Sequence, residues 1–424
     1  MLMRLAHHAL SLANVERALE LGRRAVKAWP DAPRFVALAA LLNEAGRLPE
    51  ALEAISTAAA MIQGQLPADA RYTEGMILAQ LGRIERAEAA LRITVALEPT
   101  HQGAIYALAS LLACRGAFEE ADAFFARDLP VRCDDGKFTW TRCIRLPLPG
   151  RPLGAEAPAE PVPRGRQVRF DPLTKGAGLR AVYALAADAA YLRRFGRPLA
   201  ASLARWGGGG LLLHLHIINP DQEAHALLAE LASGPLPLGI SEEAVDLSAW
   251  EEDARRSYYT CARYLMLPEL LAHYQAPILV ADIDQMLLAD PAPLLARATE
   301  GDVGLLLFEN QRQNLLSRIS ATLLLAAPTS GARRFAVTLA AVLAEAIAQP
   351  DRMVWHLDQA ALAVTQLGIE GVRSFGLDPA VVHLAPGEPP AQRPSGAGLF
   401  WSITNSIPSN RAKLESPTFR AFTR

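Results

Sequence analysis

The sequence predicts a protein of two parts: an all-α solenoid of repeated helix pairs, followed by an α/β domain with a mainly parallel sheet and helices on both faces. Two observations lead to this expectation. A pattern of small residues recurs with a period of about 34 along the first third of the chain. From residue 179 onward, short apolar runs alternate with helical stretches. The first pattern is typical of stacked helix pairs and the second of βαβ units.

The composition indicates a folded chain and excludes several classes of protein. Of 424 residues, 51% are hydrophobic and 20% are charged, so disorder is not expected. The 42 basic and 44 acidic residues give a net charge of −2, which provides no broad field for binding nucleic acid. Four scattered cysteines form neither a disulfide framework nor a Cys-x-x-Cys metal pair. With no signal peptide or transmembrane run in view, we expect a cytoplasmic protein.

Three glycines mark the repeats. Gly46, Gly82 and Gly116 each follow a pair of aliphatic residues, and each precedes an alanine by five positions. Glycine allows a tight turn between two helices, and alanine allows the helices to approach each other. Prolines fall between the units, where a helix must end, at Pro30, Pro67, Pro99 and Pro130. The segment 15–130 therefore resembles tetratricopeptide repeats, with a plain helical bundle as the alternative. The resemblance implies that residues 1–130 bind a partner, such as a protein or glycan acceptor.

A change of composition separates the two parts. The periodicity stops after residue 130, and six prolines fall within residues 147–163. We therefore assign residues 131–178 to an extended linker and residues 179–424 to the second domain. The predicted strands of that domain are 180–186, 211–218, 277–281 and 303–308, and the predicted helices are 189–205, 221–232 and 257–274. Ligands of such sheets bind beyond the carboxyl ends of the strands.

The strand at 277–281 runs directly into two carboxylates, Asp282 and Asp284. In extended backbone the side chains at positions i and i+2 point to one side, so both can bind one Mg²⁺ or Mn²⁺ ion. Such a metal would bridge the oxygens of a diphosphate. Two adjacent anions at the end of a buried strand are costly without a cation between them. Solvated loop carboxylates are the alternative.

The acidic pair belongs to a longer pattern. The pattern begins at Tyr258–Tyr264, continues through Leu267–Leu271 and the strand, and ends at Asp290 and Pro291. It resembles the core of GT-A-fold glycosyltransferases of the family-eight kind, and the resemblance covers about residues 179–415. It implies a metal-dependent hexosyltransferase that moves a sugar from a nucleotide diphosphate-sugar to an acceptor. The implied cofactor is Mn²⁺ or Mg²⁺.

The resemblance also implies roles for individual residues. Asp282 and Asp284 would hold the metal, with His383 as a third ligand, and Asp282 would lie near the ribose. Arg263 would approach the diphosphate, for which a planar guanidinium is well suited. A salt bridge on the helix surface is the alternative for Arg263. Further residues that would line the nucleotide or its phosphates are Tyr183, Ala184, Asp188, Tyr191 and Lys413. Core packing is the alternative for Tyr183, and a solvated side chain is the alternative for Lys413.

Asp358 and Gln359 resemble the Asp-Gln element that lies beside the donor sugar and the acceptor in this family. A carboxylate and an amide there would hydrogen-bond sugar hydroxyls and stabilise an oxocarbenium-like transition state. An ordinary acid in the first turn of a helix is the alternative for Asp358. The family's closing His-x-x-Gly-x-x-Lys-Pro-Trp motif is replaced after His383 by Leu384–Gly387. This departure leaves a structural role open for His383.

Two features of the domain have plainer interpretations. The four glycines at 207–210 precede a strand and lack the Lys-Ser/Thr ending of a phosphate loop, so they predict a flexible turn. His214 and His216 alternate on one strand and are expected in the core or at a sheet edge rather than on a metal.

Two other functions stay open at this point. An apolar strand that runs into Asp-x-Asp also opens the haloacid-dehalogenase-like phosphatases, in which the first carboxylate is the nucleophile. A non-catalytic repeat scaffold with a degenerate sugar-nucleotide-binding fold is the other alternative.

Overall fold

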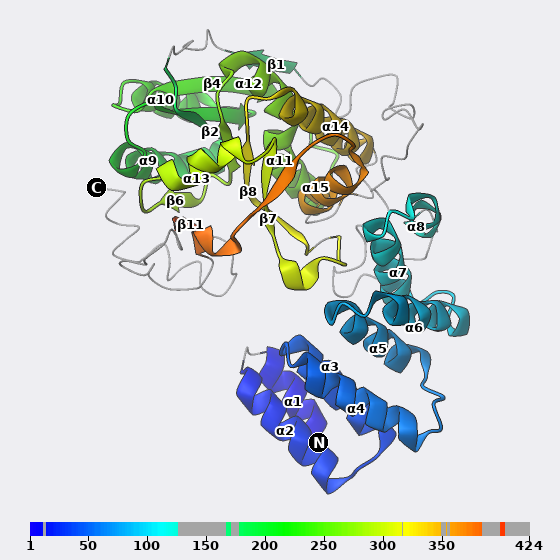
Figure 1. Cartoon of the computed structure of the whole chain (residues 1–424). Coiled ribbons are helices and arrows are strands. Elements are labelled where there is room, and N and C mark those ends of the chain that lie inside the picture. The colour runs from blue at the N-terminus through cyan, green and yellow to red at the C-terminus, as the bar shows by residue number, and fades with distance from the viewer. Residues whose placement is uncertain are drawn as a thin grey trace. The chain divides into compact units, whose positions relative to one another are not determined.

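The computed structural model describes residues 1–11, 14–125, 167–170, 178–315, 317–348, 353, 357–383 and 399–402. The chain forms two compact units, shown in Figure 1. One contains the helical repeats and the short segment Asn310–Asn314, and the other contains the rest of the α/β domain. In these described ranges, no helix has both the length and the apolar character needed to cross a membrane.

The described residues of the repeat region form four helix pairs. They are α1 (Leu2–Ser11) with α2 (Val15–Ala28), α3 (Ala32–Glu44) with α4 (Leu48–Met61), α5 (Ala68–Gln80) with α6 (Ile84–Leu97), and α7 (Gln102–Cys114) with α8 (Phe118–Phe125). The predicted turn glycines Gly46, Gly82 and Gly116 have φ angles of +70°, +70° and +80°, in the left-handed region that glycine favours. The alanines that follow them, Ala51, Ala87 and Ala121, are fully buried. The TPR-like repeats are therefore confirmed, and they begin before residue 15, at α1.

The turn glycines allow a clean test of the backbone argument. A Cβ atom on Gly82 would meet no heavy atom within 4 Å, so a substitution there tests the φ angle alone. We expect Gly82→Ala to lower the free energy of unfolding by about 1–2 kcal/mol, measured by urea denaturation, because alanine is strained in the left-handed region. Gly82→Asn is the control and should lose less, since asparagine tolerates this conformation better. Equal losses would contradict the explanation.

The α/β domain contains a mixed, mostly parallel sheet in the order β1-β4-β3-β2-β5-β8-β7-β9. β8 runs antiparallel to β5 and β7, and β1 runs antiparallel to β4; the other neighbours are parallel. The strands are β1 (Gln167–Phe170), β2 (Ala181–Asp188), β3 (Leu211–Ile218), β4 (Leu238–Ala244), β5 (Ile278–Ala281), β7 (Val303–Leu307), β8 (Ile319–Ala326) and β9 (Ser374–Leu377). The four predicted strands are confirmed. β1 corrects the assignment of 131–178 to linker alone, because it is paired with β4.

Helices cover both faces of this sheet (Figure 1). On one face lie α9 (Ala189–Trp206) and α10 (Gln222–Ala232). On the other lie α11 (Glu252–Leu265), α12 (Leu267–Tyr274), α14 (Ser330–Ile347) and α15 (Leu357–Gly368). The single helix predicted at 257–274 is two helices, because Pro268 has no N–H for continuing the first one and starts the second.

A second sheet has the order β10-β11-β6. Its strands are β6 (Gln285–Leu287), β10 (Val382–His383) and β11 (Phe400–Ser402), and α13 (Ala292–Ala296) follows β6. β11 runs antiparallel to β6, with Ser402 opposite Gln285. β6, which directly follows Asp282 and Asp284, is therefore paired with β11, a strand that lies far later in the sequence.

A continuous line of buried hydrogen bonds joins β3 and β4 to α11 and α12. It starts at Tyr274, and its first four hydrogen bonds have donor–acceptor distances from 2.8 to 3.0 Å. At its other end the hydroxyl of Tyr258 donates to Glu243. His214 and His216 are 0% and 1% exposed, so their predicted place in the core is confirmed. We call this line the buried chain; in order, its members are Tyr274, His214, Ser241, His216, Glu243 and Tyr258.

The buried chain makes folding sensitive to acid. Burial, together with the nearby rings of His216 and His273, lowers the pKa of His214 to about 3. An unfolded histidine takes a proton below its ordinary pKa of about 6.5, whereas the folded ring does not, so stability falls as pH drops from there toward the folded value. We expect this residue alone to remove about 2 kcal/mol of stability between pH 7 and pH 5.

Urea denaturation at the two pH values measures this effect. His214→Phe should be less stable at both, because Ser241 and Tyr274 lose a hydrogen-bond partner. Its stability should nevertheless change less between pH 7 and pH 5 than that of the unsubstituted chain. An unchanged pH dependence in the variant would contradict the explanation.

Candidate functional site

The candidate site lies where the order of the strands reverses, between β2 and β5. After β2 the chain adds β3 and β4 on one side, and it then returns to place β5 on the other side of β2. In open α/β sheets, ligands bind beyond the carboxyl ends of the strands at such a switch point. Asp188 ends β2 and Asp282 follows β5, so both carboxylates lie at this edge.

The acidic pair lies in a tight turn. β5 ends at Ala281, and the N–H of Gln285 donates to the carbonyl of Asp282 at 3.2 Å, which leads the chain into β6. The expectation that an extended strand aligns the two carboxylates is therefore wrong, because the chain must leave the main sheet here to join the second sheet. The side chain of Asp282 is 25% exposed, whereas Asp284 is buried.

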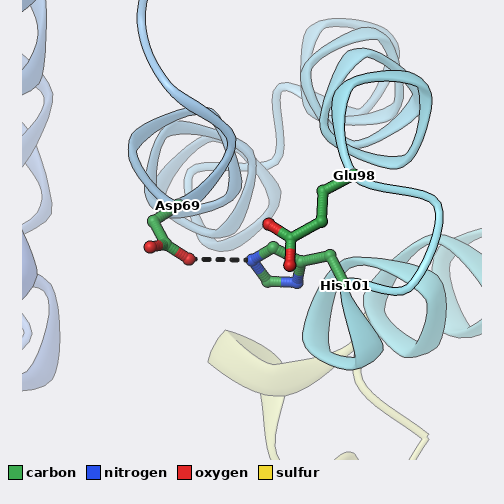
Figure 2. Close-up of side chains that lie close together, drawn as sticks. All are labelled: Asp69, Glu98 and His101. Carbon is green, nitrogen blue, oxygen red and sulfur yellow. Dashed lines mark hydrogen bonds and ion pairs between the residues drawn. The ribbon is translucent and has the colours of Figure 1, made fainter.

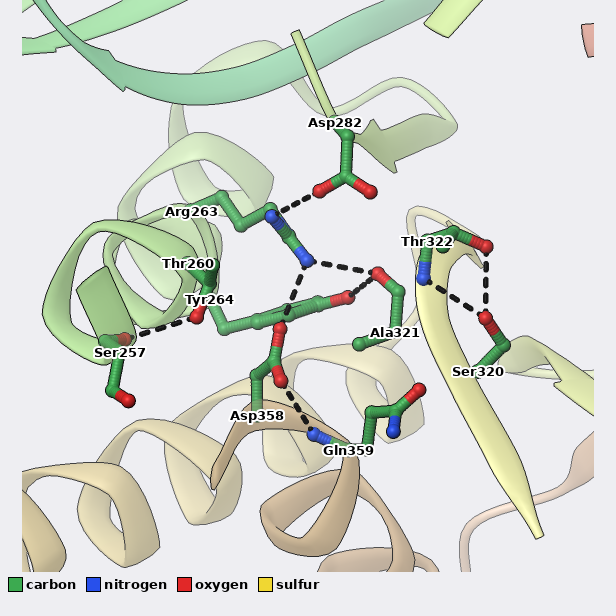
Figure 3. A network of polar contacts seen from close by, with 10 residues as sticks. All are labelled: Ser257, Thr260, Arg263, Tyr264, Asp282, Ser320, Ala321, Thr322, Asp358 and Gln359. Atoms are coloured by element: carbon green, nitrogen blue, oxygen red, sulfur yellow. Dashed lines mark hydrogen bonds and ion pairs between the residues drawn. The ribbon is translucent and has the colours of Figure 1, made fainter. Parts of the chain in front are cut away.

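Arg263 on α11 connects two carboxylates from distant segments (Figure 3). Its Nη1 donates to Oδ1 of Asp282 at 2.5 Å, and its Nη2 donates to Oδ2 of Asp358 and to the carbonyl of Ala321, both at 3.0 Å. The hydroxyl of Tyr264 donates to the same carbonyl at 2.6 Å. Burial opposes the charge of Arg263, but Asp282, Tyr264 and Asp358 outweigh this and raise its pKa. The guanidinium therefore stays charged in the interior.

This arrangement corrects the expectations for Arg263. The residue is 5% exposed, so it forms no salt bridge on the helix surface. Its Nη atoms donate to two carboxylates and a carbonyl, which come from the turn after β5, from α15 and from β8. Arg263 is a positioning residue in this structure.

Asp358 and Gln359 lie in the first turn of α15. Oδ1 of Asp358 accepts the N–H of Gln359 at 2.9 Å, and Oδ2 accepts from Arg263. Asp358 is therefore a first-turn acid, which was the alternative, and it is also fixed beside Asp282 at the switch point. Burial raises the pKa of Asp282; Arg263 lowers it and Asp358 raises it further. Asp282 and Asp358 bind the same guanidinium, and their negative charges repel each other.

Tyr183 and Ala184 on β2 are core residues. Tyr183 is 1% exposed, its ring packs on Phe400 with centroids 6.1 Å apart, and its hydroxyl donates to the carbonyl of Gln285 at 3.3 Å. Core packing, the alternative for Tyr183, describes this position. Ala184 is also 1% exposed.

Asp188 and Tyr191 lie where β2 passes into α9. Asp188 caps the helix by accepting the N–H of Tyr191 at 2.7 Å, and the Tyr191 residue is 45% exposed. Partial burial and then the charge of Asp284 raise the pKa of Tyr191, and partial burial and then the charge of Asp188 raise the pKa of Tyr259 on α11. Acidic and phenolic side chains from β2, the turn after β5, α9 and α11 therefore meet at one edge of the sheet.

Two predicted site residues cannot be placed. Lys413 lies outside the described residues, and of His383 only the backbone, in β10, is described.

Tyr264, Ser320 and the carbonyl of Ala321 were not predicted for the site; Ser320 and Thr322 lie beside it on β8 with their hydroxyl oxygens 2.9 Å apart (Figure 3). Tyr264 adjoins Arg263 in the sequence pattern, whereas a main-chain carbonyl carries no sequence signal at all.

A separate group of polar side chains lies in the repeats, where Asp69, Glu98 and His101 bring potential ligand atoms within 4.8 Å of one another (Figure 2). Nδ1 of His101 accepts the N–H of Ala104 at 3.1 Å and so caps α7. The neutral ring therefore carries its proton on Nε2, which lies 3.2 Å from Oδ1 of Asp69. A metal would need the lone pair of that nitrogen. The geometry favours a helix cap joined to the preceding repeat.

Comparisons with known proteins find similar solved structures for about a third of this chain. No protein-family model matches the sequence, and no curated protein matches it. Among solved structures, the chain is similar to YrrB, a TPR protein with an unusual peptide-binding site, at 23% identity and a TM-score of 0.26, over 30% of this chain and 64% of YrrB. It is similar to a tetratricopeptide repeat protein from Parabacteroides merdae at 18% identity and a TM-score of 0.28, over 34% and 56% of the two chains. It is also similar to PilW, a type IV pilus biogenesis factor, at 25% identity and a TM-score of 0.27, over 28% of this chain and 56% of PilW. The chain thus spans less than two thirds of each of these three.

Proposed function

We propose that the α/β domain is a metal-dependent glycosyltransferase that uses a nucleotide diphosphate-sugar, and that the repeats recruit its acceptor. The observation that carries the proposal is the meeting of Asp282 and Asp358 through Arg263 at the switch point of the sheet. These carboxylates come from the turn after β5 and the start of α15, and switch points of open α/β sheets are where ligands bind.

The residues of the turn fit Mn²⁺ or Mg²⁺. Carboxylate oxygens are the ligands that these hard cations take, and Asp282 keeps a quarter of its side chain exposed beside the bond to Arg263. Gln285 follows the pair, and neither polar atom of its buried amide has a hydrogen-bond partner in the part of the chain that is described. Asp282 and Asp284 would hold the ion, which when bound neutralises charge on a diphosphate.

The remaining side chains would act on the sugar. Asp358 and Gln359 would accept and donate hydrogen bonds to sugar hydroxyls, and Arg263 would keep the carboxylate of Asp358 in one orientation. A carboxylate fixed in this way stabilises positive charge on a sugar ring without reorganising during the reaction. Burial of the guanidinium strengthens this effect, because little water screens it.

A thermal-shift screen tests the proposal. We expect UDP-, GDP-, CDP- or dTDP-sugars to raise the melting temperature only with Mn²⁺ or Mg²⁺ present, since a ligand that binds the folded state stabilises it. Metal-dependent hydrolysis of the stabilising donor would then support transfer chemistry. Turnover of simple phosphate esters would favour the phosphatase, and the absence of any nucleotide binding would favour the scaffold.

The role of the repeats needs its own measurement. If they recruit the acceptor, removing residues 1–130 should change acceptor choice or transfer rate while donor hydrolysis is retained. Unchanged transfer would contradict this half of the proposal.

A further inference from the structure

The direction of every hydrogen bond in the buried chain follows from its acidic end. With Glu243 ionised, its carboxylate oxygens can only accept, from the hydroxyl of Tyr258 and from Nε2 of His216, so Nε2 carries a proton. Nδ1 of a neutral His216 then accepts, and Ser241 must donate to it at 2.9 Å.

The same reasoning continues to the other end. Because the only hydroxyl proton of Ser241 is committed to His216, Nε2 of His214 must donate to Ser241 at 2.9 Å. Nδ1 of His214 is then an acceptor, and Tyr274 donates to it at 2.8 Å. All donors along the four links point from Tyr274 toward Glu243.

One added proton reverses all the links between Tyr274 and His216. A doubly protonated His216 donates from Nδ1 to Ser241, Ser241 donates to Nε2 of His214, and Nδ1 of His214 donates to the oxygen of Tyr274. The ring nitrogens of both histidines and the hydroxyl of Ser241 keep their partners in both states, the hydroxyl proton of Tyr274 is released from His214, and the bond from Nε2 of His216 to Glu243 remains. Buried polar groups left without partners would cost free energy, so this match allows the core to take up charge.

We propose that the buried chain is a proton relay that stores one proton on His216 beside Glu243. A hydronium ion transfers a proton to the oxygen of Tyr274 and leaves water, while the hydroxyl proton of Tyr274 moves to Nδ1 of His214. The Nε2 proton of His214 moves to Ser241, and the hydroxyl proton of Ser241 moves to Nδ1 of His216. Each step breaks one O–H or N–H bond and forms another, with one net proton gained. His214 changes tautomer without changing charge.

The surroundings of the relay support this assignment. Tyr274 is 8% exposed, whereas the two histidines, Ser241, Glu243 and Tyr258 are at most 1% exposed, so Tyr274 is the most exposed member of the path. His214 faces Tyr274 and His273 of α12, Ser241 of β4 and the ring of Phe170 on β1. Its low pKa keeps it neutral in both states.

Within the described parts of the chain, the groups around His216 come from β4, α11, β1 and α10. It faces Ser241 and Glu243 of β4, and through Glu243 it faces Tyr258 of α11. Arg169 of β1 and His225 of α10 pair with Glu242. Glu242 alternates with Glu243 along β4, so it points to the other face of the sheet. The negative charge of Glu243 therefore stabilises the proton that is stored on His216.

Gly239 of β4 makes room for the entry of the relay. A Cβ atom there would lie 2.0 Å from the hydroxyl oxygen of Tyr274 and 3.0 Å from Nδ1 of His214. No larger residue leaves the first link intact, and Gly239→Ala should therefore separate the two groups.

Nuclear magnetic resonance of the ring nitrogens tests the relay in the full chain labelled with ¹⁵N-histidine. As the pH is lowered in steps while the protein stays folded, the relay predicts that His216 gains its second proton. At the same midpoint, His214 should switch from the Nε2–H to the Nδ1–H form. His225, which is exposed, serves as the internal reference. If His216 titrates while His214 keeps its tautomer, or if neither ring changes before the protein unfolds, the proposal fails.

Ser241→Ala is the decisive variant. With the connecting hydroxyl removed, we expect His216 to titrate and His214 to keep one tautomer throughout. A switch of His214 that persists without Ser241 would overturn the relay. The comparison of midpoints in the unsubstituted chain needs no variant, so the proposal can fail on that measurement even if Ser241→Ala does not fold.

Discussion

Arg263→Met is expected to lower the free energy of unfolding by about 3–5 kcal/mol. This is the usual cost of removing one partner from a buried ion pair, because the remaining charge has no compensation. Here two carboxylates, Asp282 and Asp358, lose their shared cation, and the carbonyl of Ala321 loses a donor. Urea denaturation near neutral pH, where both acids are ionised in the unfolded chain, measures the loss.

The same helix supplies a matched control. Arg256 pairs with Glu252 on the exposed side of α11, with 56% of its side chain exposed. Arg256→Met should change stability by no more than about 0.5 kcal/mol, as is typical of a surface pair. Adding Asp358→Asn to Arg263→Met should recover part of the loss, because it removes one uncompensated charge. Equal losses in the two arginine variants would contradict the role of Arg263 as the shared cation.

Asp284→Asn is expected to reduce metal-dependent turnover by at least about 100-fold while the fold is retained. Loss of residues that only support metal ligands costs about 10–100-fold, and a direct ligand should cost no less. Asparagine has nearly the same shape, so the tight turn between β5 and β6 should persist. Initial rates at increasing Mn²⁺ concentration measure the effect, and circular dichroism checks the fold.

Asp290→Asn is the control for this substitution. Asp290 follows β6, has 62% of its side chain exposed and lies 3.6 Å from Arg180, away from the acidic turn. Its replacement should leave both turnover and metal dependence unchanged. If Asp284→Asn retains the rate of the unsubstituted chain, Asp284 is not part of the site.

The repeats and the parallel strands could be predicted from the sequence because each depends on local spacing. β4 shows where such reasoning stops. In β4 the polar residues Ser241 and Glu243 are buried and the apolar Leu238 and Ile240 are only half-buried, so the usual alternation is inverted. The buried polar side chains of β4 find hydrogen-bond partners in His214 and His216 on the neighbouring strand and in Tyr258 of α11. A single strand gives no indication of these partners.

The candidate site was predictable in its residues but not in its connections. Asp282, Asp358 and Arg263 each carry a local sequence signal, whereas their meeting depends on how α11, β5 and α15 pack. The resemblance to GT-A-fold glycosyltransferases implied a diphosphate beside Arg263, whereas the two carboxylates that it holds come from segments far apart in the sequence. Tyr183 was similarly assigned to a nucleotide, and its position in the core became clear only with Phe400 beside it.

The pairing of β6 with β11 has a consequence for biosynthesis. A nascent polypeptide that has left the ribosome only as far as α15 contains both aspartates of the turn, but Gln285–Leu287 still lacks the antiparallel neighbour that Phe400–Ser402 provides. Contacts so distant in sequence form late during folding. The acidic turn therefore acquires its final support only after translation has passed residue 402, and an incomplete chain lacks the mature geometry of this turn.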